Sequence, residues 1–243
     1  MVSTIALFLL QAFPVSTAVP APVPGSPNLS PERRADIFMA RKMYREAIDT
    51  YKQAPLDSAI IWNKMGIAYH QMMELDIAKK HYERAQKMNP KYSEAINNLG
   101  TVYYARKSYR RATNQYKKAL KLAPQSASIY SNLGTAYFAR KDYKRALEAY
   151  QTALSLDPEV FEHRSSYGVM LQERSVEERA KFHYYLAKTY AKAGMNERAL
   201  LYIRKALEEG FKEREKLMED PEFSAMRETP EFQELLTFQP RVL

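Results

Sequence analysis

The sequence predicts an all-α solenoid of about five helix-turn-helix units, closed by a C-terminal helical cap. Three observations predict this fold. Residue types recur with a strict period of 34 positions through the middle of the chain. Within each period, apolar residues recur at the three- and four-residue spacing of two amphipathic helices. Only seven of the 243 residues are glycine, which disfavours turn-dense β folds and glycine-rich phosphate loops.

The composition is that of an ordinary globular chain, with 46% hydrophobic and 27% charged residues. Cysteine is absent, which excludes a disulfide scaffold, a thiol nucleophile and a cysteine-ligated metal. The 37 Lys and Arg residues outnumber the 28 Asp and Glu residues, which gives a formal net charge of +9. This basic balance leaves nucleic acid, anionic surfaces and acidic proteins open as partners.

Six columns of identical residue types mark the period. Each column recurs in three successive units: Gly66, Gly100 and Gly134; Ala78, Ala112 and Ala146; Tyr82, Tyr116 and Tyr150; Ala85, Ala119 and Ala153; Tyr69, Tyr103 and Tyr137; Pro90, Pro124 and Pro158. We therefore place three repeats at 59–92, 93–126 and 127–160. We expect the glycine and the first alanine of each repeat to face each other across its two helices. The proline ends the second helix because it cannot continue the hydrogen-bond ladder.

Residues in these three repeats resemble the tetratricopeptide repeat (TPR) family. In the repeat at 59–92, the residues that carry the resemblance are Trp62, Met65, Gly66, Tyr69, Ala78, Tyr82, Ala85 and Pro90. The segments Asn98-Leu99-Gly100 and Asn132-Leu133-Gly134 match the family pattern more closely. The resemblance implies a right-handed superhelix that binds a protein or peptide, and it leaves the partner unidentified.

A weaker repeat precedes these three, at 31–58. The segment Ala40–Ala47 matches Ala105–Ala112 almost residue for residue at the turn between the two helices. The second helix of this repeat is about three residues short of the 34-residue pattern.

A weaker fifth repeat follows at 180–213, so the array covers 31–213. It departs from the family pattern, because Ile203 replaces the aromatic residue and Phe211 replaces the proline. We expect Gly194 to supply the left-handed turn between its helices, where earlier repeats carry lysine.

Residues 161–179 interrupt the period. The sequence Ser175-Val176-Glu177-Glu178 is a capping box, which predicts that the first helix of repeat five begins at Val176. The stretch before it is then a short helix or loop inserted between repeats. Such an insertion either contacts a ligand or is an irregular linker.

The segment 214–243 is predicted to cap the solenoid with short helices. In both Asp220-Pro221-Glu222 and Thr229-Pro230-Glu231, a capping residue precedes a proline at the first helical position. We expect five apolar residues to face inward: Phe223, Met226, Phe232, Leu235 and Leu236. Seven acidic and four basic residues suit the polar outer face of a terminal unit.

The amino terminus predicts an export signal at 1–18. Residues 5–13 are apolar except for Gln11, too short a run to span a bilayer, and Ser16-Thr17-Ala18 fits a signal-peptidase site. Prolines then make 19–30 a disordered tether. The alternatives are an uncleaved anchor or a misassigned start codon. We expect an exported protein without a transmembrane helix in its mature chain, periplasmic or secreted if the host is bacterial.

The sequence contains no catalytic or metal-binding motif. No two of its four histidines have the spacing of a helical metal site: His70, His81, His163 and His183. A nucleophile elbow and a Walker-type loop are also missing. We therefore expect a non-enzymatic protein that uses no cofactor or metal.

The concave surface of such a stack is lined by the first helices. The residues predicted to point into this groove are Asn63, Ile67, His70, Asn97, Asn98, Thr101, Tyr104, Ser131, Asn132, Thr135, Phe138, Tyr184 and Lys188. Asparagine amides can both donate to and accept from a peptide backbone, or they can simply stay hydrated. Tyr104 and Phe138 share one repeat position, so we expect them to form an aromatic shelf.

Positive charge is concentrated in the repeat at 93–126, which has seven basic residues and one acid, Glu94, a net charge of +6. Basic residues cluster at the turns of repeats three and four and define a predicted basic ridge: Arg106, Lys107, Arg110, Arg111, Arg140, Lys141, Lys144 and Arg145. The ridge suits an anionic surface, a glycan or an acidic protein. The alternative is an ordinary soluble edge.

Three functions remain in competition. The leading hypothesis is an exported, non-enzymatic scaffold that binds a peptide in its concave groove, in a cell-envelope or secretory assembly. The second is a basic-ridge binder of an anionic surface, glycan or nucleic acid, with nucleic acid disfavoured by export and by the TPR-like columns. The third is self-assembly, which the C-terminal cap disfavours. The partner, the pathway and the oligomeric state stay open.

Overall fold

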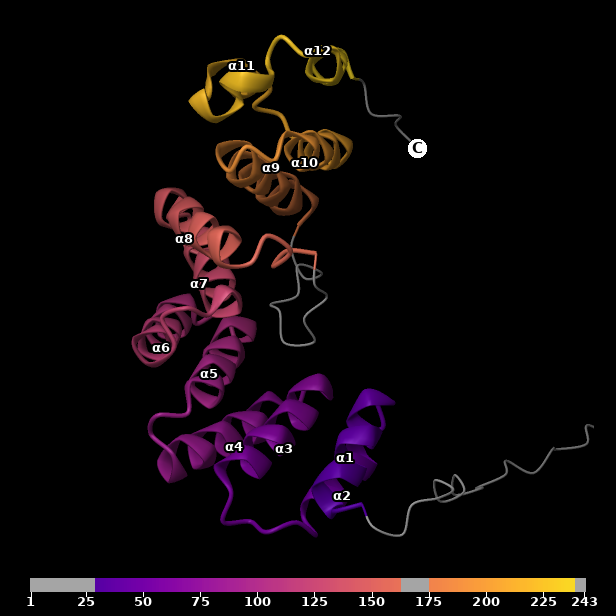
Figure 1. The fold of residues 1–243 in the computed structure, drawn as a ribbon, viewed down its shortest axis with the longest axis vertical. Coiled ribbons are helices and arrows are strands. Elements are labelled where there is room, and N and C mark those ends of the chain that lie inside the picture. The colour runs from indigo at the N-terminus through magenta and orange to yellow at the C-terminus, as the bar shows by residue number, and fades with distance from the viewer. Residues whose placement is uncertain (1–28, 163–174, 239–243) are drawn as a thin grey trace, which may run out of the picture.

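The computed structural model describes residues 29–162 and 175–238, and this part of the chain is helical without strands. Five helix pairs follow one another: α1 (Pro31–Ala40) with α2 (Tyr44–Tyr51), α3 (Ala59–Gln71) with α4 (Leu75–Met88), α5 (Ser93–Ala105) with α6 (Tyr109–Leu122), α7 (Ala127–Ala139) with α8 (Tyr143–Leu156), and α9 (Val176–Lys192) with α10 (Asn196–Glu208). Figure 1 shows the pairs stacked along the long axis, with the N-terminal pair at the bottom. The predicted all-α superhelical solenoid is confirmed.

Some predicted segments lie outside the described residues. They are the signal at 1–18, the tether except for its last two residues, the central part of the insertion, and the last five residues of the chain. Ser30, at the end of the predicted tether, caps α1, because its Oγ accepts a hydrogen bond from the backbone N–H of Arg33 at 3.3 Å.

Each helix pair closes through a residue in the left-handed backbone region. This residue is Lys42, Met73, Lys107 and Lys141 in the first four pairs, with φ between 57° and 62°. Gly194 takes the same place in the fifth pair with φ of 74°, which confirms its predicted role. In repeat two the position is occupied by Met73 rather than by lysine.

The glycines of the first helices lie against tyrosine rings of the second helices. A Cβ added at Gly66 or Gly100 would lie 2.7 Å or 2.5 Å from ring atoms of Tyr82 or Tyr116, respectively. The glycine therefore makes room for the tyrosine ring of the same repeat. At Gly134 the carbonyl oxygen of Ala146 also lies 3.2 Å from such a Cβ, as the expected glycine–alanine approach requires.

The first helix of repeat five, α9, begins at Val176, as the capping box predicts. The Ser175 Oγ accepts a hydrogen bond from the Glu178 backbone N–H at 3.1 Å. The start of the interruption is also tied to this repeat, because the Glu162 carboxylate accepts hydrogen bonds from the hydroxyls of Tyr190 (3.1 Å) and Tyr202 (3.4 Å). Repeat five therefore holds both described ends of the interruption.

The C-terminal cap consists of α11 (Glu215–Glu219), the 3-10 helix η2 (Pro221–Met226) and α12 (Pro230–Thr237). The two helices predicted after prolines are present, and α11 is an additional turn before them. The inward residues Phe223, Met226, Phe232 and Leu235 are at most 2% exposed, while Leu236 is half-buried. The cap packs on α9 and α10 at the top of Figure 1.

Candidate protein-interaction surface

The predicted groove residues all lie on the first helices α3, α5, α7 and α9, but most of them are buried. Nine of the thirteen are less than 9% exposed: Asn63, Ile67, Asn97, Asn98, Thr101, Asn132, Thr135, Phe138 and Tyr184. His70, Tyr104, Ser131 and Lys188 keep part of their surface exposed. The predicted groove residues therefore bury much of their side-chain surface against neighbouring repeats.

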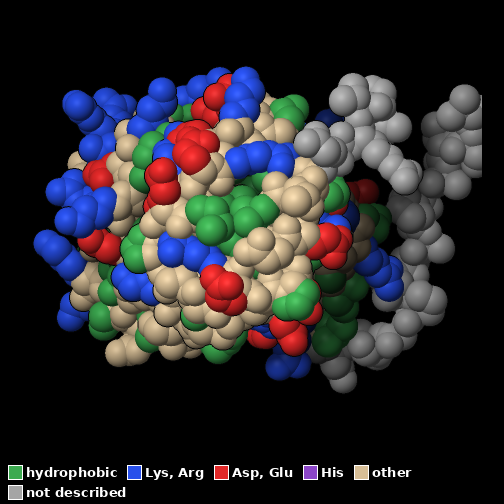
Figure 2. Space-filling view, turned by 90° about the horizontal axis from the view of Figure 1, so that it is seen from above, with side chains coloured by type: hydrophobic (Ala, Val, Ile, Leu, Met, Phe, Trp, Pro, Cys, Tyr) green, Lys and Arg blue, Asp and Glu red, His purple; other side chains and the backbone are tan. Residues whose placement is uncertain are grey.

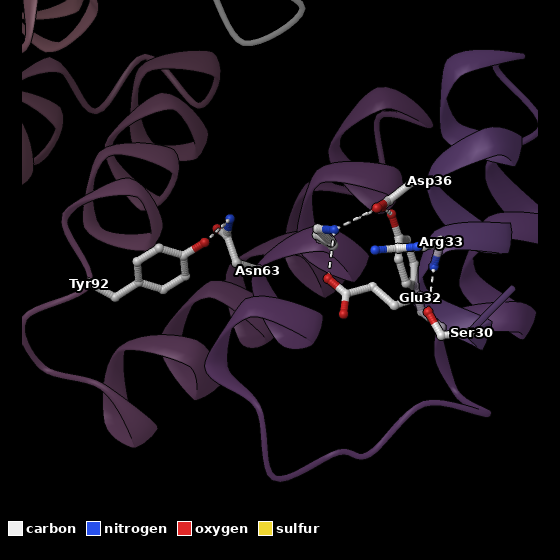
Figure 3. Close-up of polar contacts among 8 residues, drawn as sticks. Ser30, Glu32, Arg33, Asp36, Asn63 and Tyr92 are labelled. Atoms are coloured by element: carbon white, nitrogen blue, oxygen red, sulfur yellow. Dashed lines mark hydrogen bonds and ion pairs between the residues drawn. The ribbon is translucent and has the colours of Figure 1, made fainter.

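Four asparagines form a continuous chain of hydrogen bonds across three repeats, which we call the amide ladder: Asn132, Asn97, Asn98 and Asn63. The Asn132 Nδ2 donates to Asn97 Oδ1 at 3.0 Å, and the Asn97 Nδ2 donates to Asn98 Oδ1 at 3.2 Å. The Asn98 Nδ2 donates to Asn63 Oδ1 at 3.0 Å. The chain ends at Tyr92, whose hydroxyl accepts from Asn63 Nδ2 at 3.3 Å (Figure 3). The amides thus bond one another from α3 to α7.

An ionic clamp joins repeats one and two at the N-terminal end of the concave columns. The Lys64 Nζ donates to Glu32 Oε1 at 2.8 Å and to Asp36 Oδ2 at 2.8 Å, and Figure 3 shows both carboxylates converging on one amine. The Tyr51 hydroxyl donates to Asp36 at 2.6 Å. The Lys64 side chain is 26% exposed, so the clamp is partly desolvated.

A second ionic clamp occupies the C-terminal end of the columns, where two predicted groove residues meet the cap. The Lys188 Nζ lies 2.8 Å from Asp220 Oδ2 and 3.2 Å from Glu222 Oε2. The Tyr184 hydroxyl also donates to Asp220. Because Lys188 is only 13% exposed and pairs with η2, it binds the cap in this structure.

Hydroxyl and imidazole groups between the clamps are also bonded internally. The Thr101 Oγ1 donates to the Asn98 carbonyl at 2.7 Å, and the Thr135 Oγ1 donates to the Ser131 carbonyl at 2.9 Å. The His70 Nδ1 lies 3.4 Å from Thr101 Oγ1, and burial lowers the pKa of His70 below its ordinary value. A neutral imidazole at this place leaves the middle of the concave face uncharged.

The predicted aromatic shelf is divided between repeats. Tyr104 lies 5.1 Å from Tyr109, ring centre to ring centre, within its own repeat. Phe138 lies 5.3 Å from Tyr143 and 5.8 Å from Tyr185 of repeat five. The aromatic residues around Phe138 join α7 to α9, at a junction that the amide ladder does not reach.

The basic ridge is only partly neutralised. Arg106 pairs with Asp76, and Arg145 pairs with Asp142 at 3.1 Å. Arg111 lies over the ring of Tyr103, with its guanidinium carbon 5.8 Å from the ring centre. Within 29–162 and 175–238, five other cations of the ridge form no ion pair: Lys107, Arg110, Arg140, Lys141 and Lys144. Figure 2 shows Lys and Arg side chains gathered along the left side of the molecule.

Two hollows lie at opposite ends of α5 and α7. One, of about 520 Å³, lies on the basic ridge and is lined by Lys107, Ser108, Tyr109, Arg110, Arg111 and Arg140. The other, of about 380 Å³, lies beside the amide ladder and is lined by Ser93, Glu94, Asn97, Ala123, Pro124, Gln125, Ser126, Ser128 and Ile129. We call them the basic hollow and the Glu94 hollow.

Several contributors to this surface were missed from the sequence: Lys64, Tyr92, Asp220, Glu222 and the hollow around Glu94. Lys64 occupies the same repeat position as Asn98 and Asn132, so the column itself contained the signal. In the described part of the chain, no group of His, Asp and Glu residues is arranged to hold a metal ion, and no helix is suited to crossing a membrane.

Comparison with known proteins agrees with this architecture. Residues 59–92 and 127–160 match the family model "Tetratricopeptide repeat", and residues 100–139 match the model "TPR repeat". No curated protein sequence matches the chain.

The fold is similar to solved structures of MamA. One of these shares 20% identity with a TM-score of 0.50 and covers 74% of this chain and 96% of that chain. Another, of residues 41 to the end of MamA from Desulfovibrio magneticus RS-1, shares 22% identity with a TM-score of 0.51 and covers 73% and 92%. At this identity the likeness concerns the fold alone.

The family models and the repeated helix pairs lead to the same assignment. The periodic glycine, alanine, tyrosine and proline columns of repeats two to four fall within the matched residues. TPR repeats with this fold support a scaffold for protein–protein interaction. The chain contains tetratricopeptide repeats, at 59–92 and within 100–160.

Proposed function

We propose that the protein is an exported, non-enzymatic scaffold that binds a segment of a partner protein on the concave face of repeats two to four. The observation that carries this proposal is the Glu94 hollow, because it opens beside the amide ladder and is lined by α5, α7 and the loop between α6 and α7. Its lining combines hydroxyl and amide groups with apolar side chains such as Ile129. Such a mixture of polar and apolar groups suits a side chain of the bound partner segment together with the backbone next to it.

The amide ladder gives this face a defined shape. Since Asn63, Asn97, Asn98 and Asn132 bond one another, the first helices are held in register before any partner arrives. A preorganised surface loses less conformational entropy on binding. The partly exposed side chains His70, Tyr104 and Ser131 then present themselves to the partner at three successive repeats.

The groove is tested with a substitution that blocks it without breaking the ladder. Ser131→Arg adds a bulky cation on α7 at a half-buried side chain, and Asn114→Arg adds the same group on the exposed face of α6 as a control. We expect Ser131→Arg to lower recovery of the native partner about tenfold in affinity capture from the host, with Asn114→Arg like wild type. Equal recovery from both folded variants would contradict the groove.

Export and the cell-envelope or secretory setting are supported by the amino-terminal sequence. An apolar run of signal-peptide length precedes small residues and a proline-rich stretch. The expected mature protein starts at Val19. N-terminal sequencing of the protein purified from its native host checks this, and an uncleaved cytosolic chain would contradict it.

The second candidate function uses the basic ridge to bind an anionic surface, glycan or nucleic acid. The observation that favours it is the basic hollow, which has four cations and no acid among its lining residues. Heparin binding would support this candidate if the logarithm of the binding constant falls linearly with the logarithm of the salt concentration. The variant Lys107→Glu with Arg110→Glu should abolish such binding, and no binding at low salt would remove this candidate.

A further inference from the structure

The two hollows differ in charge and lie at the two ends of the same helices. The Glu94 hollow adjoins the first residues of α5 and α7, and the basic hollow adjoins the turns that follow their last residues. Both hollows lie where repeats three and four meet. A segment that crosses the concave face along α5 and α7 therefore reaches one hollow with each end.

The surface between the two hollows offers little that is free to bind. Asn97, Asn98 and Asn132 donate to and accept from one another, and the Thr101 and Thr135 hydroxyls donate to backbone carbonyls. Hydrogen bonds that already exist must be broken before a ligand can use them, so they add little net affinity. Selective recognition must come from the two ends.

The Glu94 hollow suits a basic side chain. Glu94 is the single acid of repeat three, its side chain is exposed, and its Oε2 accepts a hydrogen bond from Ser93 Oγ at 3.1 Å. Ser126 and Ser128 add hydroxyl oxygens, and none of the described lining residues is a lysine or arginine. An ammonium group finds acceptors here, while its methylene stem packs on Ile129.

The basic hollow suits a carboxylate. Lys107 and Arg110 form no ion pair among the described residues. Arg111 of the same repeat and Arg140 of the next repeat also line the hollow. Ser108 and Tyr109 add hydroxyl groups to the lining. Guanidinium groups bind carboxylates in a two-bond geometry, which adds both affinity and direction.

The distance between the hollows sets the spacing of the two charges. Helix α5 has 13 residues, which at 1.5 Å per residue makes it about 20 Å long. An extended chain covers about 3.3 Å per residue, so about six residues span this distance.

We propose, on the basis of the proposed groove function, that the partner segment is extended and charge-polarised. An Asp or Glu side chain occupies the basic hollow, and a Lys or Arg about six residues away occupies the Glu94 hollow. The segment between them is held by shape over the amide ladder. The occupant is thus a peptide with separated opposite charges, rather than a uniformly acidic one.

The test uses the full-length protein and labelled synthetic peptides in fluorescence anisotropy. One peptide carries Asp and Lys separated by about five neutral polar residues, in both chain directions, and a second has the same composition with the two charges adjacent. A third carries Asp at both ends. We expect the separated Asp and Lys peptide, in one direction, to bind about tenfold tighter than the adjacent-charge peptide.

A charge swap separates this inference from simple electrostatic attraction. The variant Glu94→Lys should reverse the preference, so that the peptide with Asp at both ends binds about tenfold tighter than the Asp and Lys peptide. Glu94→Gln should remove the preference, and Glu148→Lys, on the exposed face of α8, should keep the wild-type order. Unchanged preference in Glu94→Lys, or no binding up to roughly 1 mM, would overturn the inference.

The remaining outcomes distinguish the two proposals. If Ser131→Arg abolishes partner capture but affinity ignores charge separation, the groove function stands and the charge-polarised segment is wrong. If Ser131→Arg changes nothing and heparin binding depends on Lys107 and Arg110, the basic ridge binds an anionic polymer and both proposals are wrong.

Discussion

Repeats two to four and repeat five solve the same packing problem in different ways. In repeats two to four, a glycine of the first helix lies against a tyrosine ring of the second, as with Gly100 and Tyr116. In repeat five, Ala187 takes the glycine position and Ile203, 16 residues later, takes the tyrosine position, with both side chains fully buried. The size of the side chain at this position of the first helix therefore limits the size of the side chain that fits opposite it on the second helix.

Repeat one is an informative intermediate between these two solutions. It combines Ala35 with Tyr51, and both are buried. Its second helix, α2, has eight residues, whereas α4, α6 and α8 have 14. A short second helix contacts its partner over fewer turns, so it can shift to accept one extra methyl group.

The largest expected effect comes from Gly100→Ala. The added Cβ would lie 2.5 Å from the Tyr116 ring. Both α5 and α6 extend beyond this contact in both directions. We expect the free energy of unfolding to fall by about 3 kcal/mol, the upper part of the range for overpacked cores. Urea unfolding followed by circular dichroism measures it.

The matched control is Ala187→Gly in repeat five, which should cost only about 1 kcal/mol through helix propensity. The double variant Gly100→Ala with Tyr116→Ile copies the repeat-five pair and should be clearly more stable than the sum of the single effects. Strict additivity would contradict the idea that the two positions are coupled.

The fold was largely predictable because local rules and the period agree. The period placed the helix pairs, and the capping box at Ser175 placed the start of α9. Gly194 identified its turn because left-handed backbone favours glycine. The additional turn α11 lacks a proline start and a hydrophobic period, so it carried no comparable signal.

The concave contacts were less predictable because they do not follow the sequence period. Asn98 bonds Asn63, and Asn132 bonds Asn97, so each partner is 35 positions away rather than 34. Successive first helices are rotated in a superhelix, so a side chain meets its neighbour from an adjacent column. Columns read from the sequence therefore identified the right residues without identifying their partners.

The next largest effect is expected in the amide ladder of repeats two to four, which repeat five lacks. Asn98→Ala removes the donor to Asn63 Oδ1 and the acceptor for Asn97 Nδ2 in a buried setting. We expect a loss of about 2 kcal/mol in the free energy of unfolding, because both remaining groups stay desolvated. Urea unfolding compares it with Asn114→Ala on the exposed face of α6.

The control variant should change stability by less than about 0.5 kcal/mol. A double-mutant cycle of Asn98→Ala with Asn63→Ala isolates the ladder, since the second removal should add little once the first bond is lost. Equal costs for Asn98→Ala and Asn114→Ala would show that water replaces the ladder bonds.

A smaller, pH-dependent effect distinguishes repeat two from repeat five. Burial lowers the pKa of His70, His81 and His183 below 6.5, and in repeat five Glu209, 2.8 Å from His183, partly opposes this. The unfolded chain then binds more protons than the folded chain as pH falls below about 6.5, so stability is lost on acidification. Each histidine contributes a slope of at most about 1.4 kcal/mol per pH unit.

Urea unfolding between pH 7.5 and 5 measures this slope, and His70→Gln should reduce it. His183→Gln should reduce it less, because of Glu209. The carboxyls of Asp76 and Glu213, whose pKa values are lowered by hydrogen bonds to Arg106 and Lys216, lose their contributions at lower pH. A stability that stays constant down to pH 5 in the wild type would contradict the burial of these imidazoles.

The smallest expected effect lies within the tyrosine column itself. The Tyr150 hydroxyl donates to Thr135 Oγ1 at 3.3 Å, whereas the buried Tyr116 hydroxyl has no hydrogen-bond partner in the described part of the chain. Tyr116→Phe should therefore raise the free energy of unfolding by about 1 kcal/mol, and Tyr150→Phe should lower it by a similar amount. Thermal unfolding of both variants tests this prediction. A loss of stability in Tyr116→Phe would contradict it, because it would reveal a hydrogen bond from the Tyr116 hydroxyl to bound water. The tyrosine hydroxyls of repeats three and four would then both be hydrogen-bonded.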